Sequence, residues 1–207
     1  MPSDLASAPE LKIDKQRASI VRAASRSDRN LYDLFIDEIS SIAASARETF
    51  SAASALCEWL PADQAVLRQA TYQIAVLAKA TSQGIDDTLK KENLKVPVAD
   101  AAVPALLLKS INPGPYENAS EPWPVVGIRI ISAFRKISLQ LAVQCDEASE
   151  FGFLLGAEAL HQALRHWEEQ WNQSAQLLQG AKSGFCAAAY MADVEHPYSF
   201  RPTSSKH

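Results

Sequence analysis

The hydrophobic positions of this chain recur at intervals of three and four residues, which is the spacing of one face of an α-helix. Proline lacks the backbone donor that a helix interior needs, so prolines separate the helical runs. The proline clusters leave three windows, 10–60, 62–96 and 125–196, and no window shows the alternating pattern of a strand. The pattern therefore predicts an all-α protein.

The first window predicts a helix over about 31–59, which Asn30 caps and Asp33 supports as in a capping box. The second window predicts a helix that Asp63 caps and that ends near Lys91. Polar and apolar spacing puts one set of residues on the inner face of this second helix: Leu67, Ala70, Ile74, Leu77, Thr81 and Ile85.

The third window is too long for one globular helix and carries Gly152 and Gly156 in its middle. It therefore predicts helices over about 125–150 and 157–182, the second of which stops at Gly180 and Gly184. A four-three spacing marks the inner stripe of this last helix: Leu160, Leu164, Trp167, Trp171, Ser174 and Leu178.

Short links join helices 1 and 2 and helices 3 and 4, whereas a Pro-rich crossover of about thirty residues separates helices 2 and 3. This arrangement is typical of a ferritin-like four-helix bundle. We expect an N-terminal arm over 1–27, the bundle over 28–182 and a C-terminal tail over 183–207.

Composition narrows the class of protein further. The chain has 207 residues, of which 47% are hydrophobic and 21% are charged, and its net charge is −4. These values are typical of a soluble domain and leave no basic footprint for nucleic acid and no membrane span. Three cysteines without a CxxC pair, and the absence of a secretory signal pattern, favour a cytoplasmic protein with reduced thiols. We expect Cys57 and Cys145 to lie in the core and Cys186 to be exposed.

Two stretches resemble a ferritin-like bacterial family of unknown function that includes the YciE and YciF stress proteins. Leu31–Ile39 is similar to the opening of the family's first helix, and Ala142–Ala159 is similar to the joint between its third and fourth helices. The likeness covers about residues 28–180. It implies a four-helix bundle that is often dimeric, with a dinuclear metal site of inward-facing Glu and His residues.

The sequence departs from that ligand set. The second helix has acids only at its two ends, and residues 125–145 of the third contain no Asp, Glu or His. On the first helix, Ala46 stands where the resemblance implies a second carboxylate. Glu38 is therefore the only one of the two implied carboxylates that this helix retains. A dinuclear iron or manganese site needs several carboxylates from all four helices. We therefore expect no metal and no other cofactor, and we interpret Glu38 as a half-buried acid paired with an arginine or a hydroxyl.

Glu158 and His161 match the short pattern Glu-x-x-His of such sites. At about 100° per residue, however, they point about 160° and 100° away from the inner stripe of their helix. His166 and Glu169 fail in the same way, at about 120° and 180°. We interpret all four as side chains of solvated helix faces.

No catalytic motif occurs, so we assign no catalytic residue. Trp167 and Trp171 lie on the inner stripe and are interpreted as core residues, with the lining of a ligand pocket as the alternative. Four aromatic residues in the crossover and the tail are candidates for a partner surface, and packing on the bundle itself is the alternative for them: Tyr116, Trp123, Tyr198 and Phe200.

The leading hypothesis is a metal-free ferritin-like protein that acts by binding or assembly, in a homodimer and in connection with stress. The first alternative is an enzyme, either a cofactor-free enzyme with a pocket between the helices or a dimetal oxidase or peroxidase. The dimetal enzyme would draw unconventional ligands from five acids: Glu38, Glu48, Asp146, Glu147 and Glu150. The second alternative is an immunity or adaptor protein that binds a protein partner through its acidic surface.

Overall fold

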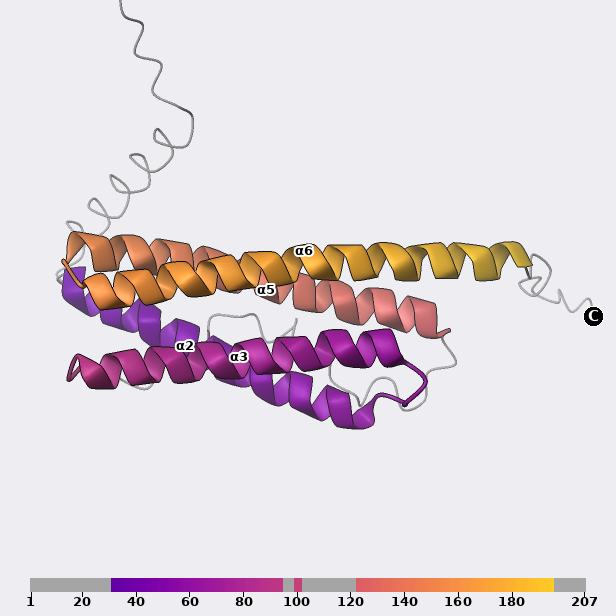
Figure 1. Cartoon of the computed structure of the whole chain (residues 1–207), viewed down its shortest axis with the longest axis horizontal. Coiled ribbons are helices and arrows are strands. Elements are labelled where there is room, and N and C mark those ends of the chain that lie inside the picture. Colours follow the sequence, from indigo (N-terminus) through magenta and orange to yellow (C-terminus); the bar gives the residue numbers. More distant parts are fainter. Residues whose placement is uncertain (1–30, 95–98, 102–121, 196–207) are drawn as a thin grey trace, which may run out of the picture.

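The computed structural model describes residues 31–94, 99–101 and 122–195 of the chain. These residues form four α-helices and no strand: α2 (Leu31–Trp59), α3 (Ala65–Lys91), α5 (Trp123–Leu154) and α6 (Glu158–Glu195). The helices lie side by side as one elongated bundle (Figure 1). The all-α fold class is thus confirmed.

The bundle consists of two helical hairpins. A short turn joins α2 to α3 and another joins α5 to α6, and within each hairpin the two helices pack along one another. The hairpins meet through α2 on α5 and α3 on α6, and α3 runs antiparallel to α6 (Figure 1). α3 ends at one end of the bundle and α5 begins at the other, so the connection between them joins opposite ends (Figure 1). This is the ferritin-like arrangement that the connection lengths predict.

The first hairpin agrees with the predicted bounds except at one cap. α2 has the predicted limits, although Asn30 lies outside the described residues. α3 ends at Lys91 as predicted, but Gln64 takes the capping position without a side-chain hydrogen bond. The prediction that Asp63 caps α3 is therefore wrong, because the turn after Pro61 places Asp63 one residue too early.

The joint between α5 and α6 lies at Gly156, whose φ of +67° breaks the helix. α5 runs through Gly152 to Leu154, past the predicted end near 150. A Cβ atom at Gly152 would lie 3.3 Å from the backbone nitrogen of His161 and from the ring of Phe35. Gly152 thus permits a close approach of three helices instead of stopping one.

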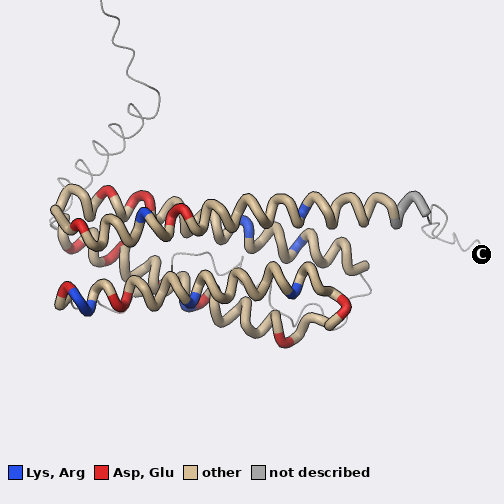
Figure 2. Tube along the Cα trace, viewed as in Figure 1, with Lys and Arg blue, Asp and Glu red and all other residues tan. Residues whose placement is uncertain are grey.

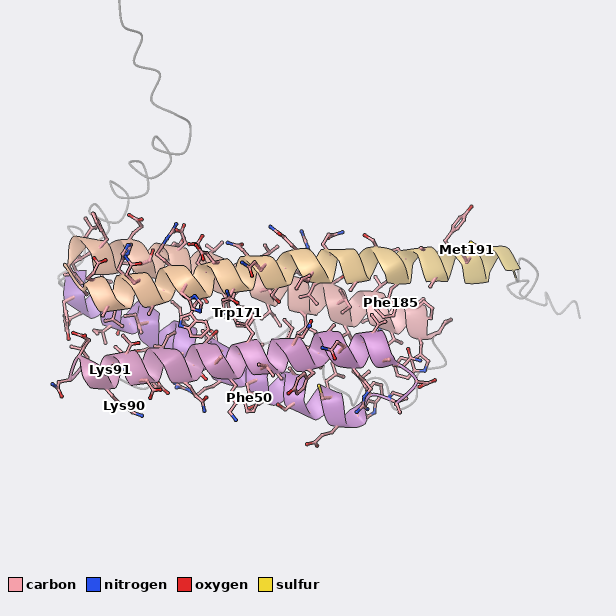
Figure 3. All side chains as sticks on the ribbon, viewed as in Figure 1. Phe50, Lys90, Lys91, Trp171, Phe185 and Met191 are labelled. Carbon is pink, nitrogen blue, oxygen red and sulfur yellow. The ribbon has the colours of Figure 1, made fainter. Side chains whose placement is uncertain are left out.

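α6 continues to Glu195, so the predicted end near 182 is wrong and helix crosses the expected boundary between bundle and tail. Gly180 and Gly184 adopt helical backbone, since a glycine lowers helix stability by only about 1 kcal/mol unless its φ is positive. Phe185 holds this part of α6 on α5, where its ring lies over Gly127 with 2.7 Å to a Cβ built there. Beyond Phe185, α6 extends past the ends of the other three helices (Figure 1), and Met191 lies on this projecting end (Figure 3).

Charge is distributed unevenly along the bundle. Acidic residues gather at the end where α5 joins α6, whereas the far half of α6 is almost free of charge (Figure 2). Between Gln170 and Ala192 the only charged residue is Lys182. The two ends of the bundle therefore present different surfaces.

Candidate functional site

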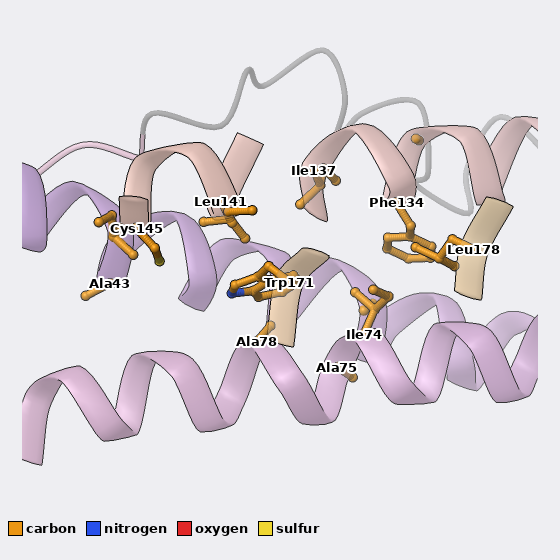
Figure 4. Close-up of a cluster of buried hydrophobic side chains, with 14 of the residues drawn as sticks. Ala43, Ile74, Ala75, Ala78, Phe134, Ile137, Leu141, Cys145, Trp171 and Leu178 are labelled. Carbon is orange, nitrogen blue, oxygen red and sulfur yellow. The ribbon is translucent and has the colours of Figure 1, made fainter. Parts of the chain in front are cut away.

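The centre of the bundle is the place where the resemblance implies a metal site, and apolar side chains fill it. Trp171 of α6 is fully buried there and is among the largest such side chains of the described residues. Figure 4 shows its ring between α5 and α3, beside buried neighbours from three helices: Ala43, Ile74, Ala78, Ile137, Leu141 and Cys145. The prediction that Trp171 is a core residue is confirmed.

These central residues do not fit a dinuclear metal. Ala46, at the position of the implied carboxylate, is completely buried, and neither α3 nor α5 brings an acid or histidine to the level of Trp171. Iron and manganese require oxygen or imidazole donors, which Ala, Ile, Leu and Trp do not supply. No group of three or more His, Cys, Asp or Glu residues within the described ranges has the geometry to hold a metal ion.

Glu38 of α2 lies toward the charged end and is half-buried. Burial raises the pKa of its carboxyl group, and the negative charges of Glu147 and Asp37 raise it further. Among the described residues it has no arginine or hydroxyl partner, so the expected pairing is not found. Glu38 instead belongs to an acidic region in which the protonated form is favoured.

The other candidate acids are dispersed. Arg165 of α6 donates to Asp146 of α5 at 2.7 Å and lies 2.6 Å from a carboxylate oxygen of Glu168 on its own helix. One guanidinium thus pairs with the two carboxylates that α5 and α6 bring together, which leaves a net charge of −1 for the three groups. Of the remaining acids, Glu48 and Glu147 are exposed and Glu150 is half-buried. The structure does not assemble them into one site.

The Glu-x-x-His pattern of α6 lies at the joint with α5, where His161 is half-buried, so its assignment to a solvated helix face is wrong. Glu158 is exposed and accepts a hydrogen bond of 2.7 Å from Gln162. His161 points sideways, with Nδ1 2.9 Å from the carbonyl oxygen of Ser149 and its ring 5.6 Å from that of Phe153. These contacts tie α6 to α5. His166, further along, is exposed and lies edge-on to Trp167.

A groove of about 890 Å³ runs between α3 and α6 on the other half of the bundle. Exposed apolar side chains form its walls, Val66, Tyr72 and Val76 from α3 and Leu177 from α6, and Trp167 lies on its floor. Its polar residues are mostly glutamines, and no Asp, Glu, Lys or Arg lines it. Pockets of this size and lining bind apolar surfaces. Trp167 is therefore both half-buried against the core and a groove residue.

Sequence reasoning missed this groove. Tyr72 is 60% exposed and Leu177 is 68% exposed, although both are large and apolar. Leu177 lies about 100° and Tyr72 about 170° from the inner stripe of its helix, and large apolar residues at such positions are the signal that could have revealed a second apolar face.

The three cysteines differ in burial. Cys145 is buried and Cys186 is exposed, as predicted, but Cys57 is only half-buried, so its assignment to the core is wrong. Burial raises the pKa of the Cys145 and Cys57 thiols.

Trp123, a candidate for the partner surface at the start of α5, packs against Trp59 with 5.8 Å between ring centroids. The other three candidates lie outside the described residues: Tyr116, Tyr198 and Phe200.

The fold and the site define a class: a ferritin-like four-helix bundle with an apolar centre and an uncharged lateral groove. Among solved structures, the chain is similar to the E. coli stress protein YciF, with a TM-score of 0.68 and 16% sequence identity. The match covers 77% of this chain and 98% of that one. The fold that the resemblance implies is thus confirmed.

No protein-family model matches the chain, and no curated protein matches it. Within the described part of the chain, none of the helices is both long enough and apolar enough to cross a membrane.

Proposed function

We propose that this protein is a metal-free ferritin-like bundle that acts by binding another protein chain, in the first place a second copy of itself. The observation that carries the proposal is the uncharged groove between α3 and α6, whose walls expose Tyr72, Val76 and Leu177 to solvent. Contiguous apolar patches on a soluble protein are typical of protein interfaces, and depletion of charge marks the core of such interfaces.

The centre of the bundle supports the metal-free part of the proposal. A metal at the centre would have to displace the fully buried indole of Trp171, and the neighbouring side chains of Ala43 and Ala78 carry no donor atoms. Arg165 already pairs with both Asp146 and Glu168 at the charged end. The fold is thus used without the donor set that gives ferritin-like proteins their redox chemistry.

The cellular role follows from the relative. YciF is described as a stress protein, and we propose that this chain likewise acts in a stress response, in the cytoplasm. Its three free cysteines are compatible with a reducing compartment. Its partner is a protein, since the groove lacks the basic residues that nucleic acid or an anionic membrane surface would require.

Elemental analysis and light scattering of one sample test both parts. Cells are grown with added iron and manganese, and the protein is purified natively. The expected result is a homodimer with far less than one metal ion per chain. Two equivalents of iron or manganese would overturn the metal-free part and favour the dimetal oxidase. A monomer that captures a different chain in a stoichiometric complex would replace self-assembly by an adaptor role.

A further inference from the structure

The face of α6 that lines the groove continues beyond the groove to Met191, four residues before the end of the helix. Seven residues recur at alternating spacings of four and three: Gln170, Ser174, Leu177, Ala181, Gly184, Ala188 and Met191. At about 100° per residue they stay within about 50° of one direction. This stripe lies about 90° from the core stripe of Trp171 and Leu178, so α6 has two apolar faces.

The second stripe extends past its neighbour in the bundle. α3 begins at Ala65, and the end of α6 runs on beyond it (Figure 1). Met191 is 55% exposed, and a Cβ atom at Gly184 would meet nothing within 4 Å among the described residues. A helix face with heptad spacing and no charge is what a partner helix requires.

We propose that the C-terminal part of α6 pairs antiparallel with the same helix of a second copy, about a two-fold axis between Lys182 and Ser183. Each projecting helix end then fills the α3–α6 groove of the other copy. This inference rests on the proposed self-assembly and specifies its surface. An isologous interface uses the same patch on both copies, so that patch must contain both the projecting helix end and the groove that receives it. α6 contributes to both.

The register follows from the residues. In an antiparallel pair about this axis, facing residues have numbers that sum to 365. Leu177 then faces Ala188 of the second copy, Met191 faces Ser174, and Ala181 faces Gly184. Every pair places a larger side chain opposite a smaller one, as interdigitated packing requires. The small residues at the axis let the two backbones approach closely.

Charge and length agree with this register. Over the paired residues 174–191 each helix carries one charge, Lys182, which points about 130° away from the stripe. This overlap spans about 26 Å, and the acids Asp193 and Glu195 follow it in the sequence. The α3 walls of the groove, with Tyr72 and Val76, then cover the projecting end of the other copy.

Charge insertion is the first test. We compare Leu177→Glu with Gln179→Glu in the full chain, because both positions are exposed and Gln179 lies on the opposite side of α6. Two carboxylates inside an apolar interface should raise the dimer dissociation constant at least about a hundredfold, whereas Gln179→Glu should leave it unchanged. Light scattering over a dilution series measures both, and helical circular dichroism confirms that both variants fold.

Disulfide trapping tests the register itself, in a Cys186→Ser background. Leu177→Cys with Ala188→Cys places thiols at facing positions, and Gln170→Cys with Ala188→Cys is the control shifted by two turns along the same stripe. Neither pair can close within one chain, since 11 and 18 residues of helix separate them by about 16 and 27 Å, beyond the reach of a disulfide. Mild oxidation should convert the first variant to a covalent dimer at least about tenfold more completely than the second.

The outcomes separate the two proposals. A dimer that survives Leu177→Glu, or equal trapping of both cysteine pairs, overturns this register while self-assembly stands. A wild-type chain that stays monomeric at micromolar concentration overturns self-assembly together with the register.

Discussion

The two halves of α6 differ in charge and in their contacts with the rest of the bundle. The first half, from Glu158 to Glu169, is rich in charge and is tied to α5 by Arg165 and His161. The second half has one charged residue between Gln170 and Ala192. It extends past the end of α3 and exposes apolar side chains to solvent. The first half is therefore satisfied within its own chain, whereas the second has the composition of an interface core.

On the proposed function, this difference separates a half that is held by contacts within the chain from a half that binds a partner. At the charged end Arg165 pairs with two carboxylates, and Trp171 fills the centre. The apolar surface on the other half has no counterpart inside the described part of the chain. Selection for assembly would preserve that surface without any demand on the centre.

Trp171 marks the boundary between the halves, and its removal should have the largest effect. Trp171→Ala deletes a fully buried indole and leaves a cavity, so we expect the free energy of unfolding to fall by about 3–5 kcal/mol. Urea unfolding followed by circular dichroism measures the loss. Trp167→Ala, at the half-buried groove floor, is the matched control and should cost clearly less. Equal losses would mean that the groove floor is as much a part of the core as the centre.

The anchor of the projecting half is the contact between Phe185 and Gly127. A methyl group at Gly127 would lie 2.7 Å from the Phe185 ring, so Gly127→Ala must displace that ring. We expect a net loss of about 1–2 kcal/mol, since overpacking outweighs the gain in helix propensity. Hydrogen exchange should quicken selectively at 185–191.

Gly180→Ala is the control for this anchor, because nothing lies within 4 Å of its added methyl group. It should stabilise α6 by about 0.5–1 kcal/mol through helix propensity alone. Uniform exchange along α6 in Gly127→Ala would show that Phe185 does not anchor the projecting end.

The fold was within reach of sequence reasoning because proline positions and helical periodicity are local signals. Both helices of the first hairpin end where the pattern predicts. The end of α6 was missed because Gly180 and Gly184 were interpreted as stops, whereas a glycine ends a helix only where its φ becomes positive, as at Gly156. The contact between Phe185 and Gly127 depends on tertiary packing, which no local sequence pattern encodes.

The candidate site was also predictable only in part. The sequence alone shows that the central helix positions lack metal-binding side chains, and the structure adds that Trp171 occupies the space. The groove depends on how far α3 lies from α6, which is set by packing of the whole bundle. Tyr72, Val76 and Leu177 gave a partial signal, since they are large, apolar and off the core stripe.

Arg165 sets the character of the charged half, and its replacement tests that half directly. Arg165→Gln leaves Asp146 and Glu168 facing one another, so the pKa of Glu168, which burial already raises, should rise further. The pairs are partly exposed, and we expect a loss of no more than about 1 kcal/mol at pH 7. Because the pKa of the Glu168 carboxyl group is raised, that group is protonated at about pH 3, and its share of the loss should disappear there.

Arg47→Gln is the control for the charged half, since Arg47 pairs with Asp86 at 3.1 Å between α2 and α3 and both side chains are more exposed. Its effect should be smaller than that of Arg165→Gln, and 1 M salt should reduce it. A larger loss from Arg47→Gln would show that the charged end is not the place where ion pairing matters.

Glu38 should give the smallest effect, and one of opposite sign. Burial and the neighbouring Glu147 and Asp37 raise the pKa of its carboxyl group in the folded state. The folded protein therefore holds this proton more tightly than the unfolded chain does, and the free energy of unfolding falls as the pH rises through that range. Glu38→Gln removes this loss, so it should stabilise the protein by less than about 1 kcal/mol at pH 7 and by nothing at about pH 3. Thermal unfolding at the two pH values, with exposed Glu48→Gln as the control, measures the difference. A destabilised Glu38→Gln variant at pH 7 would show that the charge of Glu38 is needed, and would return this acid to the list of functional candidates.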